Sequence, residues 1–150
     1  MFNSSWQDRF RMIASVYLML SNERGEVLLL RRRNTGFKDG ELGLPAGHAD
    51  GGEPLALAMR REAREEVGID IQPEALTLAH AMHRNCGDHE RLDFFFIANR
   101  WVGEVVNAEP DKCEQLLWAP LDNLPKDVID YYVQAFDCVR DGKAYSAFGW

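Results

Sequence analysis

The sequence predicts a single α/β domain in which a mixed β-sheet lies between helices. Apolar and β-branched segments typical of strands are interrupted by one central helical segment, and a second helical segment follows near the C-terminus. The length of 150 residues suits one domain, and no repeat, low-complexity tract or linker marks a second one. We therefore expect residues 1–150 to form one domain with a full hydrophobic core.

The N-terminal third of the chain is expected to contain a β-hairpin. Residues 11–20 are rich in apolar and β-branched side chains and predict a strand. Residues 22–25 predict a turn, and residues 27–31 predict the returning strand of the hairpin. Residues 34–40 are polar and contain glycines, which indicates a loop.

The rest of the chain combines two predicted helices with three predicted strands. A helix is expected over residues 53–67, because the Glu-Pro pair at its start places proline in the first turn. Residues 75–84 and 92–101 predict strands, and the apolar run DFFFIA in the second is typical of a strand covered on both faces. Residues 116–119 predict a short strand, and residues 126–140 predict the final helix. The apolar stripe of that helix comprises Val128, Tyr132, Ala135, Phe136 and Val139.

Composition argues against several classes of function. The formal net charge of −7 disfavours a surface that coats nucleic acid, which needs clustered Lys and Arg. No segment reaches membrane-spanning length, and residues 1–12 lack the apolar run of a signal peptide. The three cysteines are few, odd in number and widely spaced, which indicates reduced thiols in a cytoplasmic protein. We therefore expect neither a nucleic-acid partner nor a membrane partner.

Three carboxylates gather on one side of the central predicted helix. Glu62, Glu65 and Glu66 are spaced three and four residues apart, so they project from neighbouring positions. Glu66 falls inside the apolar stripe of the helix, where a carboxylate needs a partner such as a bound cation. The alternative is a solvated helix face held by ion pairs. The glycine-rich turn upstream, which can meet phosphate, and Gly68, which suits a left-handed helix cap, favour the cation site. The stripe comprises Leu55, Met59 and Ala63.

Residues 47–69 read GHADGGEPLALAMRREAREEVGI and resemble the Nudix box of the MutT/Nudix hydrolase family. That pattern is G-x5-E-x7-R-E-U-x-E-E-x-G-U, in which U is a bulky aliphatic residue. Ala63 is smaller than the usual residue at its position, and the upstream GLPAG has Ala46 where the family often has glycine. The resemblance implies the α/β/α sandwich of that family. The matching residues are Gly47, Glu53, Arg61, Glu62, Glu65, Glu66, Gly68 and Ile69.

The resemblance also implies a divalent-metal site. Glu62 and Glu66 would be the main ligands, and Glu65 would be a ligand or a bridging partner. Mg²⁺ is the expected ion, with Mn²⁺ as the alternative, because oxygen donors suit hard cations. Arg61 would orient a box glutamate through an ion pair and Glu53 would tie the loop to the helix start, although both could give structural support only. The implied metal ligands are Gly47, through its carbonyl, Glu62, Glu65 and Glu66.

Members of the family often add one acid from a loop late in the fold, as a metal ligand or a general base. The segment EPDKCE supplies three candidates, Glu109, Asp111 and Glu114. Glu114 is favoured, then Glu109, and for each the alternative is a solvated loop acid. The expected catalytic set is Glu65, Glu66, Arg61 and Glu114.

Candidates for substrate contact lie outside the box. The arginines at 31–33 follow a strand and could bind the substrate's phosphates or base, or could protect an edge strand by charge. His80 would point into the cleft or lie on the sheet. Aromatic side chains that could stack on a base, or belong to the core or surface, are Phe37, Trp118 and Tyr132. The expected substrate contacts are Arg31, Arg33, His80 and Trp118.

A zinc site is a weaker possibility in the same region. Histidine and cysteine recur there every three residues, but a period of three alternates faces on a strand and lacks the close pairs of structural sites. We therefore disfavour zinc. The residues concerned are His80, His83, Cys86 and His89.

The resemblance implies hydrolysis of a nucleoside diphosphate linked to another group, with a small-molecule nucleotide as partner. Marks of the ADP-ribose, diadenosine polyphosphate and coenzyme A subfamilies are absent, so a nucleoside triphosphate cleaved to monophosphate and pyrophosphate is favoured. A nucleotide sugar or dinucleoside polyphosphate remains an alternative. So does a non-catalytic nucleotide sensor, although such sensors usually lose box glutamates and this chain retains them. A homodimer is left open.

Overall fold

Two sheets and two helices are arranged in layers in the computed structural model, which describes residues 5–150. Residues 1–4, the start of the predicted domain and of the segment in which no signal peptide is expected, lie outside the described residues. The strands are β1 (Ile13–Leu20), β2 (Glu26–Arg32), β3 (Leu42–Gly43), β4 (Ala46–His48), β5 (Thr77–Asn85), β6 (Glu90–Ala98), β7 (Cys113–Pro120) and β8 (Tyr145–Phe148). The helices are α1 (Leu55–Val67) and α2 (Asp130–Arg140), with short 3-10 turns at Trp6–Asp8 and Pro73–Ala75.

The larger sheet is mixed, as predicted. It has five strands in the order β4-β1-β6-β5-β8. β1 runs parallel to β6 and antiparallel to β4, and β5 runs antiparallel to β6 and parallel to β8. The smaller sheet has three strands in the order β3-β2-β7.

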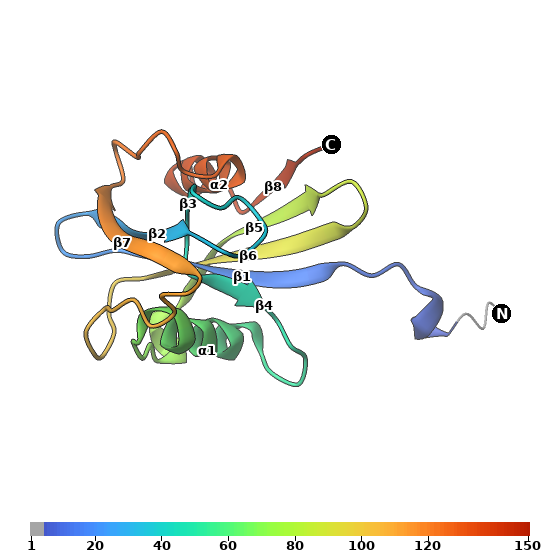
Figure 1. The fold of residues 1–150 in the computed structure, drawn as a ribbon. Helices are drawn as coiled ribbons and strands as arrows, with labels where there is room; N and C mark the ends of the chain where they lie inside the picture. The colour runs from blue at the N-terminus through green and yellow to red at the C-terminus, as the bar shows by residue number, and fades with distance from the viewer. Residues whose placement is uncertain (1–4) are drawn as a thin grey trace.

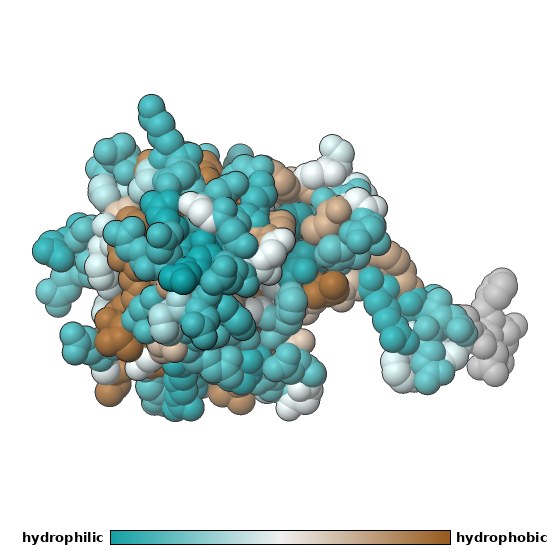
Figure 2. All heavy atoms as spheres, in the orientation of Figure 1, coloured by the Kyte–Doolittle hydropathy of each residue, from teal (hydrophilic) through white to brown (hydrophobic). Residues whose placement is uncertain are grey.

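The helices cover opposite sides of the sheets (Figure 1), which confirms the predicted sandwich. β1 shows how the two cores form, because successive side chains of a strand face opposite sides. Tyr17 and Met19 pack in the core that contains α2, whereas Val16, Leu18 and Leu20 pack in the core that contains α1. The face of the molecule in Figure 2 is largely hydrophilic, with scattered apolar patches.

β6 and α1 match the predictions closely. Phe95 packs in the core on the α2 side and Phe96 in the core on the α1 side, so β6 is covered on both faces. α1 begins after Pro54 and ends at Gly68, whose left-handed φ of 71° suits glycine.

Within residues 5–150 none of the helices combines the length and the hydropathy that a membrane-spanning segment needs. Cys86, Cys113 and Cys138 are free thiols.

The predicted hairpin of the first two strands is wrong. Both edges of β1 are hydrogen-bonded to β4 and β6, so β2 pairs with β3 and β7 in the other sheet. A single bridge between Ser21 and Val27 remains at the turn. The final helix starts later than predicted, at Asp130, because the backbone at Asp127 and Ile129 is hydrogen-bonded to Leu42.

Candidate active site

The close contact between β4 and α1 depends on a glycine. Gly47 lies on β4 where the strand passes the side chain of Glu62 on the helix. A β-carbon at this position would overlap the Glu62 carboxyl group. A side chain of any other residue would therefore displace either the strand or the glutamate.

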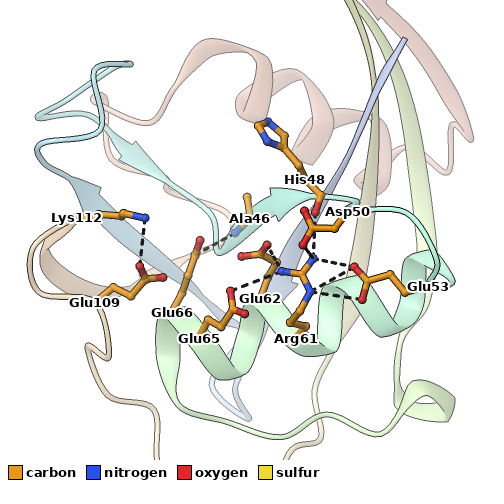
Figure 3. Close-up of polar contacts among 10 residues, drawn as sticks. All are labelled: Ala46, His48, Asp50, Glu53, Arg61, Glu62, Glu65, Glu66, Glu109 and Lys112. Atoms are coloured by element: carbon orange, nitrogen blue, oxygen red, sulfur yellow. Dashed lines mark hydrogen bonds and ion pairs between the residues drawn. The ribbon is translucent and has the colours of Figure 1, made fainter. Parts of the chain in front are cut away.

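Arg61 holds the acidic side chains of the helix and of the preceding loop in place (Figure 3). Its Nη1 donates to Glu62 Oε1 at 2.8 Å, and its Nη2 donates to Glu53 Oε1 at 2.8 Å and to the His48 carbonyl at 3.1 Å. The hydrogen bond to Glu53 is the main reason why the pKa of Arg61 is raised. The expected ion pair between this arginine and a box glutamate is therefore present. Glu65 lies farther from it, at 3.6 Å, and is half-exposed.

Glu66 is partly buried, and its carboxyl group lies against the backbone of β4. Its Oε2 accepts a hydrogen bond from the backbone N–H of Ala46 at 3.1 Å, and within residues 5–150 no basic side chain forms an ion pair with it. Burial raises its pKa to about 8, and the nearby carboxylates of Glu62 and Glu109 add to the effect. An ionised Glu66 therefore needs a cation close to it.

These groups open onto one cavity of about 910 Å³. The helix supplies one wall, β1 and β4 supply the adjacent floor, and segments after β2 and before β7 complete the rim. The volume suits a nucleotide-sized ligand. The polar lining residues on the helix side are Gly47, Asp50, Arg61, Glu62, Glu65, Glu66 and Glu109.

The donors in this cavity suit a hard divalent cation. They are carboxylate and carbonyl oxygens, and the excess of negative charge around Glu66 would be offset by such an ion. No three His, Cys, Asp or Glu side chains in the described part of the chain already enclose a metal position. Glu62, Glu65 and Glu66 fit Mg²⁺ in chemistry and location, and their oxygens would have to converge further to bind it together.

Comparison with known proteins decides the family. Residues 11–136 match the family model described as the NUDIX domain. The chain belongs to the Nudix family. The Nudix box is therefore the segment that runs from Gly47 on β4 through α1 to Ile69.

Individual relatives agree with this assignment. The chain is 28% identical over 109 residues to an 8-oxo-dGTP diphosphatase of Escherichia coli K12, with 71% of this chain and 83% of that protein covered. It is 34% identical over 125 residues to the NAD-capped RNA hydrolase NudC of Stutzerimonas stutzeri A1501, with 80% of this chain covered. The match covers 43% of NudC, so the chain spans less than half of that relative. The crystal structure of a MutT NUDIX hydrolase from Burkholderia pseudomallei is similar to this structure, with a TM-score of 0.76 at 27% identity. The match covers 85% of this chain and 97% of that one.

The late acid beside the Nudix box differs from the expectation. Glu109 lines the cavity and pairs with Lys112 at 3.5 Å, whereas Glu114 is exposed on β7 and does not line it. Cys113 does line the cavity, and strand alternation turns the next side chain away. Asp111 is exposed and also outside the lining. The favoured order, Glu114 before Glu109, is therefore not supported by the geometry.

Of the three arginines at 31–33, the one that lines the cavity is Arg32, which lies between the two predicted ones. Arg32 lines the cavity, with Nε donating to the Phe37 carbonyl at 2.8 Å and its guanidinium over the Phe37 ring. Arg31 instead pairs with Asp127 at 2.7 Å, and Arg33 is exposed outside the cavity. Neither of the two predicted arginines is thus placed to contact a ligand in this cavity.

His80 and Trp118 also lie away from the cavity. His80 is 1% exposed, and its ring nitrogens meet the Lys143 carbonyl at 2.8 Å and Ser146 Oγ at 2.7 Å. Trp118 stacks on Trp101 with ring centroids 6.2 Å apart. Both side chains are held by structural contacts, so their expected roles in substrate binding are not supported. Phe37 and Tyr132, the other aromatic candidates, do line the cavity.

The part of the cavity lined by β1, β5 and β6 carries polar residues that the sequence did not single out. Arg84 of β5 and Arg91 of β6 line it together with Ser15 and Tyr17 of β1. The one feature of the sequence that could have pointed to these arginines is Asp93, an acid at the start of the apolar run of β6. A buried acid in such a strand implies a basic partner, but the register that identifies the partner is a property of the folded sheet.

Proposed function

We propose that this protein is a Mg²⁺-dependent pyrophosphohydrolase that cleaves a phosphoanhydride bond in a nucleoside diphosphate derivative. The form we favour converts a nucleoside triphosphate to a monophosphate and pyrophosphate. The carrying observation is the acidic wall of the cavity, made by Glu62, Glu65 and Glu66, where Arg61 holds Glu62 and the desolvated Glu66 forms no ion pair with a basic side chain among the described residues. The negative charges of this wall would repel those of a diphosphate, so the wall cannot bind a diphosphate without a cation.

A bound divalent ion would neutralise phosphate charge and activate the attacking water. Glu62, Glu66 and the Gly47 carbonyl are the proposed ligands, since Gly47 and Glu62 touch and Glu66 is held by the backbone of β4. Arg61 is a positioning residue, because it fixes the Glu62 carboxylate by a hydrogen bond of 2.8 Å. Glu65 and Glu109 remain available to accept a proton from water, which is the role of a general base.

Two observations support a nucleotide such as a nucleoside triphosphate as the substrate: the extent of the match to relatives and the lining of the cavity. The chain covers most of the Escherichia coli relative named 8-oxo-dGTP diphosphatase and less than half of NudC. Arg32 and Phe37 form a cationic and aromatic part of the cavity lining, which suits the phosphates and base of a nucleotide. A nucleotide sugar or dinucleoside polyphosphate would use the same acidic wall and is the alternative substrate class.

The decisive experiment measures pyrophosphate and monophosphate release from a panel of nucleoside triphosphates, nucleotide sugars and dinucleoside polyphosphates with Mg²⁺. Glu66→Gln should slow the best substrate by more than about a hundredfold, because even the outer partners of metal ligands contribute about ten- to a hundredfold. Glu23→Gln, in an exposed turn outside the cavity, is the matched control. A wild-type protein no faster than Glu66→Gln on every substrate would favour a nucleotide sensor instead.

A further inference from the structure

Two arginines face each other directly on the part of the cavity that β5 and β6 line, which forms a basic wall. Arg84 of β5 and Arg91 of β6 are cross-strand partners, and both line the cavity. Like charges at directly opposed positions destabilise a sheet. A pair of this kind inside a cavity therefore needs compensation from another group.

The protein supplies only part of that compensation. Asp93, which is fully buried, accepts from Arg84 Nε at 2.6 Å, and Arg91 Nε lies 3.7 Å from the same carboxylate. Among residues 5–150 no second carboxylate pairs with either arginine. Two guanidinium groups and one carboxylate leave an excess of one positive charge at this wall.

The arginines also retain donors that no protein group uses. Arg91 Nη2 donates to Ser15 Oγ at 2.6 Å, but its buried Nε has no hydrogen-bond partner within the described residues. Arg84 donates to Asp93 and, at 3.2 Å, to the Tyr17 hydroxyl, while its guanidinium lies 3.9 Å from the centre of the Tyr131 ring. The Nη1 groups of both arginines also have no partner within the described residues and, unlike Arg91 Nε, are not buried, so the wall is suited to a ligand that brings acceptors.

The basic wall, formed by Arg84 and Arg91, adjoins the Nudix box. Ser15, the partner of Arg91, sits opposite His48 in the pairing of β1 with β4. Gly47, which contacts Glu62, is the next residue along β4. Gly47 and His48 face opposite sides of β4, but both the acidic and the basic wall line the same cavity, so one ligand there can contact both.

We propose that Arg84 and Arg91 form an anion subsite that binds a phosphate or carboxylate of the substrate other than the two phosphates joined by the cleaved bond. The excess positive charge favours a formal anion over a neutral carbonyl. A nucleoside triphosphate would supply its terminal phosphate, and another nucleoside diphosphate derivative would supply an acidic group on the attached moiety. The role in substrate binding rests on the proposed function, whereas anion binding itself does not.

Inorganic phosphate, added to protein freed of divalent ions on a chelating resin, tests the subsite without catalysis. Without a divalent ion the acidic wall repels phosphate, so specific binding must come from the basic wall. In two-dimensional ¹H–¹⁵N NMR spectra, phosphate should shift the Arg91 Nε–H and Ser15 amide signals saturably. Chloride at equal ionic strength should not. Equal shifts with both salts, or none with phosphate, would overturn the subsite.

Substitution of Arg91 identifies the group responsible. Arg91→Gln should weaken phosphate binding by about tenfold or more, in line with the loss of a charge-assisted hydrogen bond. Arg91→Lys should retain part of the binding, and Arg24→Gln, at a side chain that is 80% exposed, should retain all of it. Arg91 is preferred to Arg84 for this test, because loss of Arg84 would leave Asp93 without its closest partner. Unchanged binding in a folded Arg91→Gln protein would contradict the proposal.

Matched substrates separate the two sources of the anion. The KM values of wild type and Arg91→Gln would be compared for dGTP against dGDP, and for NADPH against NADH. We expect KM to rise about tenfold more for the phosphate-bearing member of at least one pair. An equal rise for both members of both pairs would overturn the role in substrate binding. If the protein hydrolyses nothing but Arg91 binds phosphate, the proposed function fails and the subsite stands.

Discussion

Gly47 and Glu62 are in contact because β4 passes α1 with no room for a side chain between them. The contact places the backbone of the strand beside a carboxylate of the helix. It gives the first glycine of the Nudix box a steric reason, independent of any bound ion.

Gly47→Ala is therefore expected to damage the site more than the fold. The added methyl group must push Glu62 away from β4 or move the strand. A displacement of about 1 Å can cost about a hundredfold in rate, so we expect a fall in kcat of that order. The measurement is kcat against Mg²⁺ concentration, with circular dichroism melting as a check on the fold. A variant with wild-type kcat and Mg²⁺ dependence would show that the contact is unimportant.

The desolvated carboxyl group of Glu66 predicts how the metal-free protein responds to pH. Its pKa rises from an ordinary 4.5 to about 8 on folding, mainly through burial. Between these values the folded state holds a proton that the unfolded chain has released, so the folded state binds more protons. Stability must therefore fall as pH rises from about 5 to about 8.

Urea denaturation in EDTA at several pH values measures this slope. Glu66→Gln should remove the contribution of Glu66 and flatten the profile, because glutamine does not titrate. Glu23→Gln, an exposed substitution, should leave the slope as in wild type. An identical slope in wild type and Glu66→Gln would show that Glu66 ionises normally.

The Arg84–Asp93 pair predicts a large effect on stability. Arg84→Met leaves the fully buried Asp93 with Tyr17 at 3.0 Å and the more distant Arg91 as its polar contacts. Removal of one partner of a buried pair typically costs about 3–5 kcal/mol. Urea denaturation should show a loss in that range, and Arg84→Met combined with Asp93→Leu should recover part of it. Arg140→Met, at an exposed arginine, should change the free energy of unfolding by less than about 1 kcal/mol.

The sequence predicted those features that depend on local spacing. The box glutamates share one side of a helix whose start at Pro54 and end at Gly68 are both encoded locally. The long strands β1 and β6 were found because their apolar patterns extend over 8 and 9 residues. β3, β4 and β8 have 2, 3 and 4 residues, too few for a recognisable period.

Features that depend on pairing between distant segments could not be predicted. The partner of β2 is set by competition for the edges of β1, which is decided by the whole sheet. Arg84 and Arg91 meet only through the register of β5 and β6. Whether Glu114 reaches the cavity likewise depends on which face of β7 turns inward, and whether Glu109 does depends on the path of the loop before it.

The choice between the two late acids is itself testable. Glu109 lines the cavity and raises the pKa of Glu66, whereas Glu114 is exposed outside it. We expect Glu109→Gln to lower kcat by about ten- to a hundredfold, the range for a general base or for a group that supports metal ligands. Glu114→Gln, the matched control on the same segment, should retain wild-type kcat. A larger loss of kcat in Glu114→Gln than in Glu109→Gln would mean that β7 or the loop before it rearranges when substrate binds. Glu114 would then be the acid of the site.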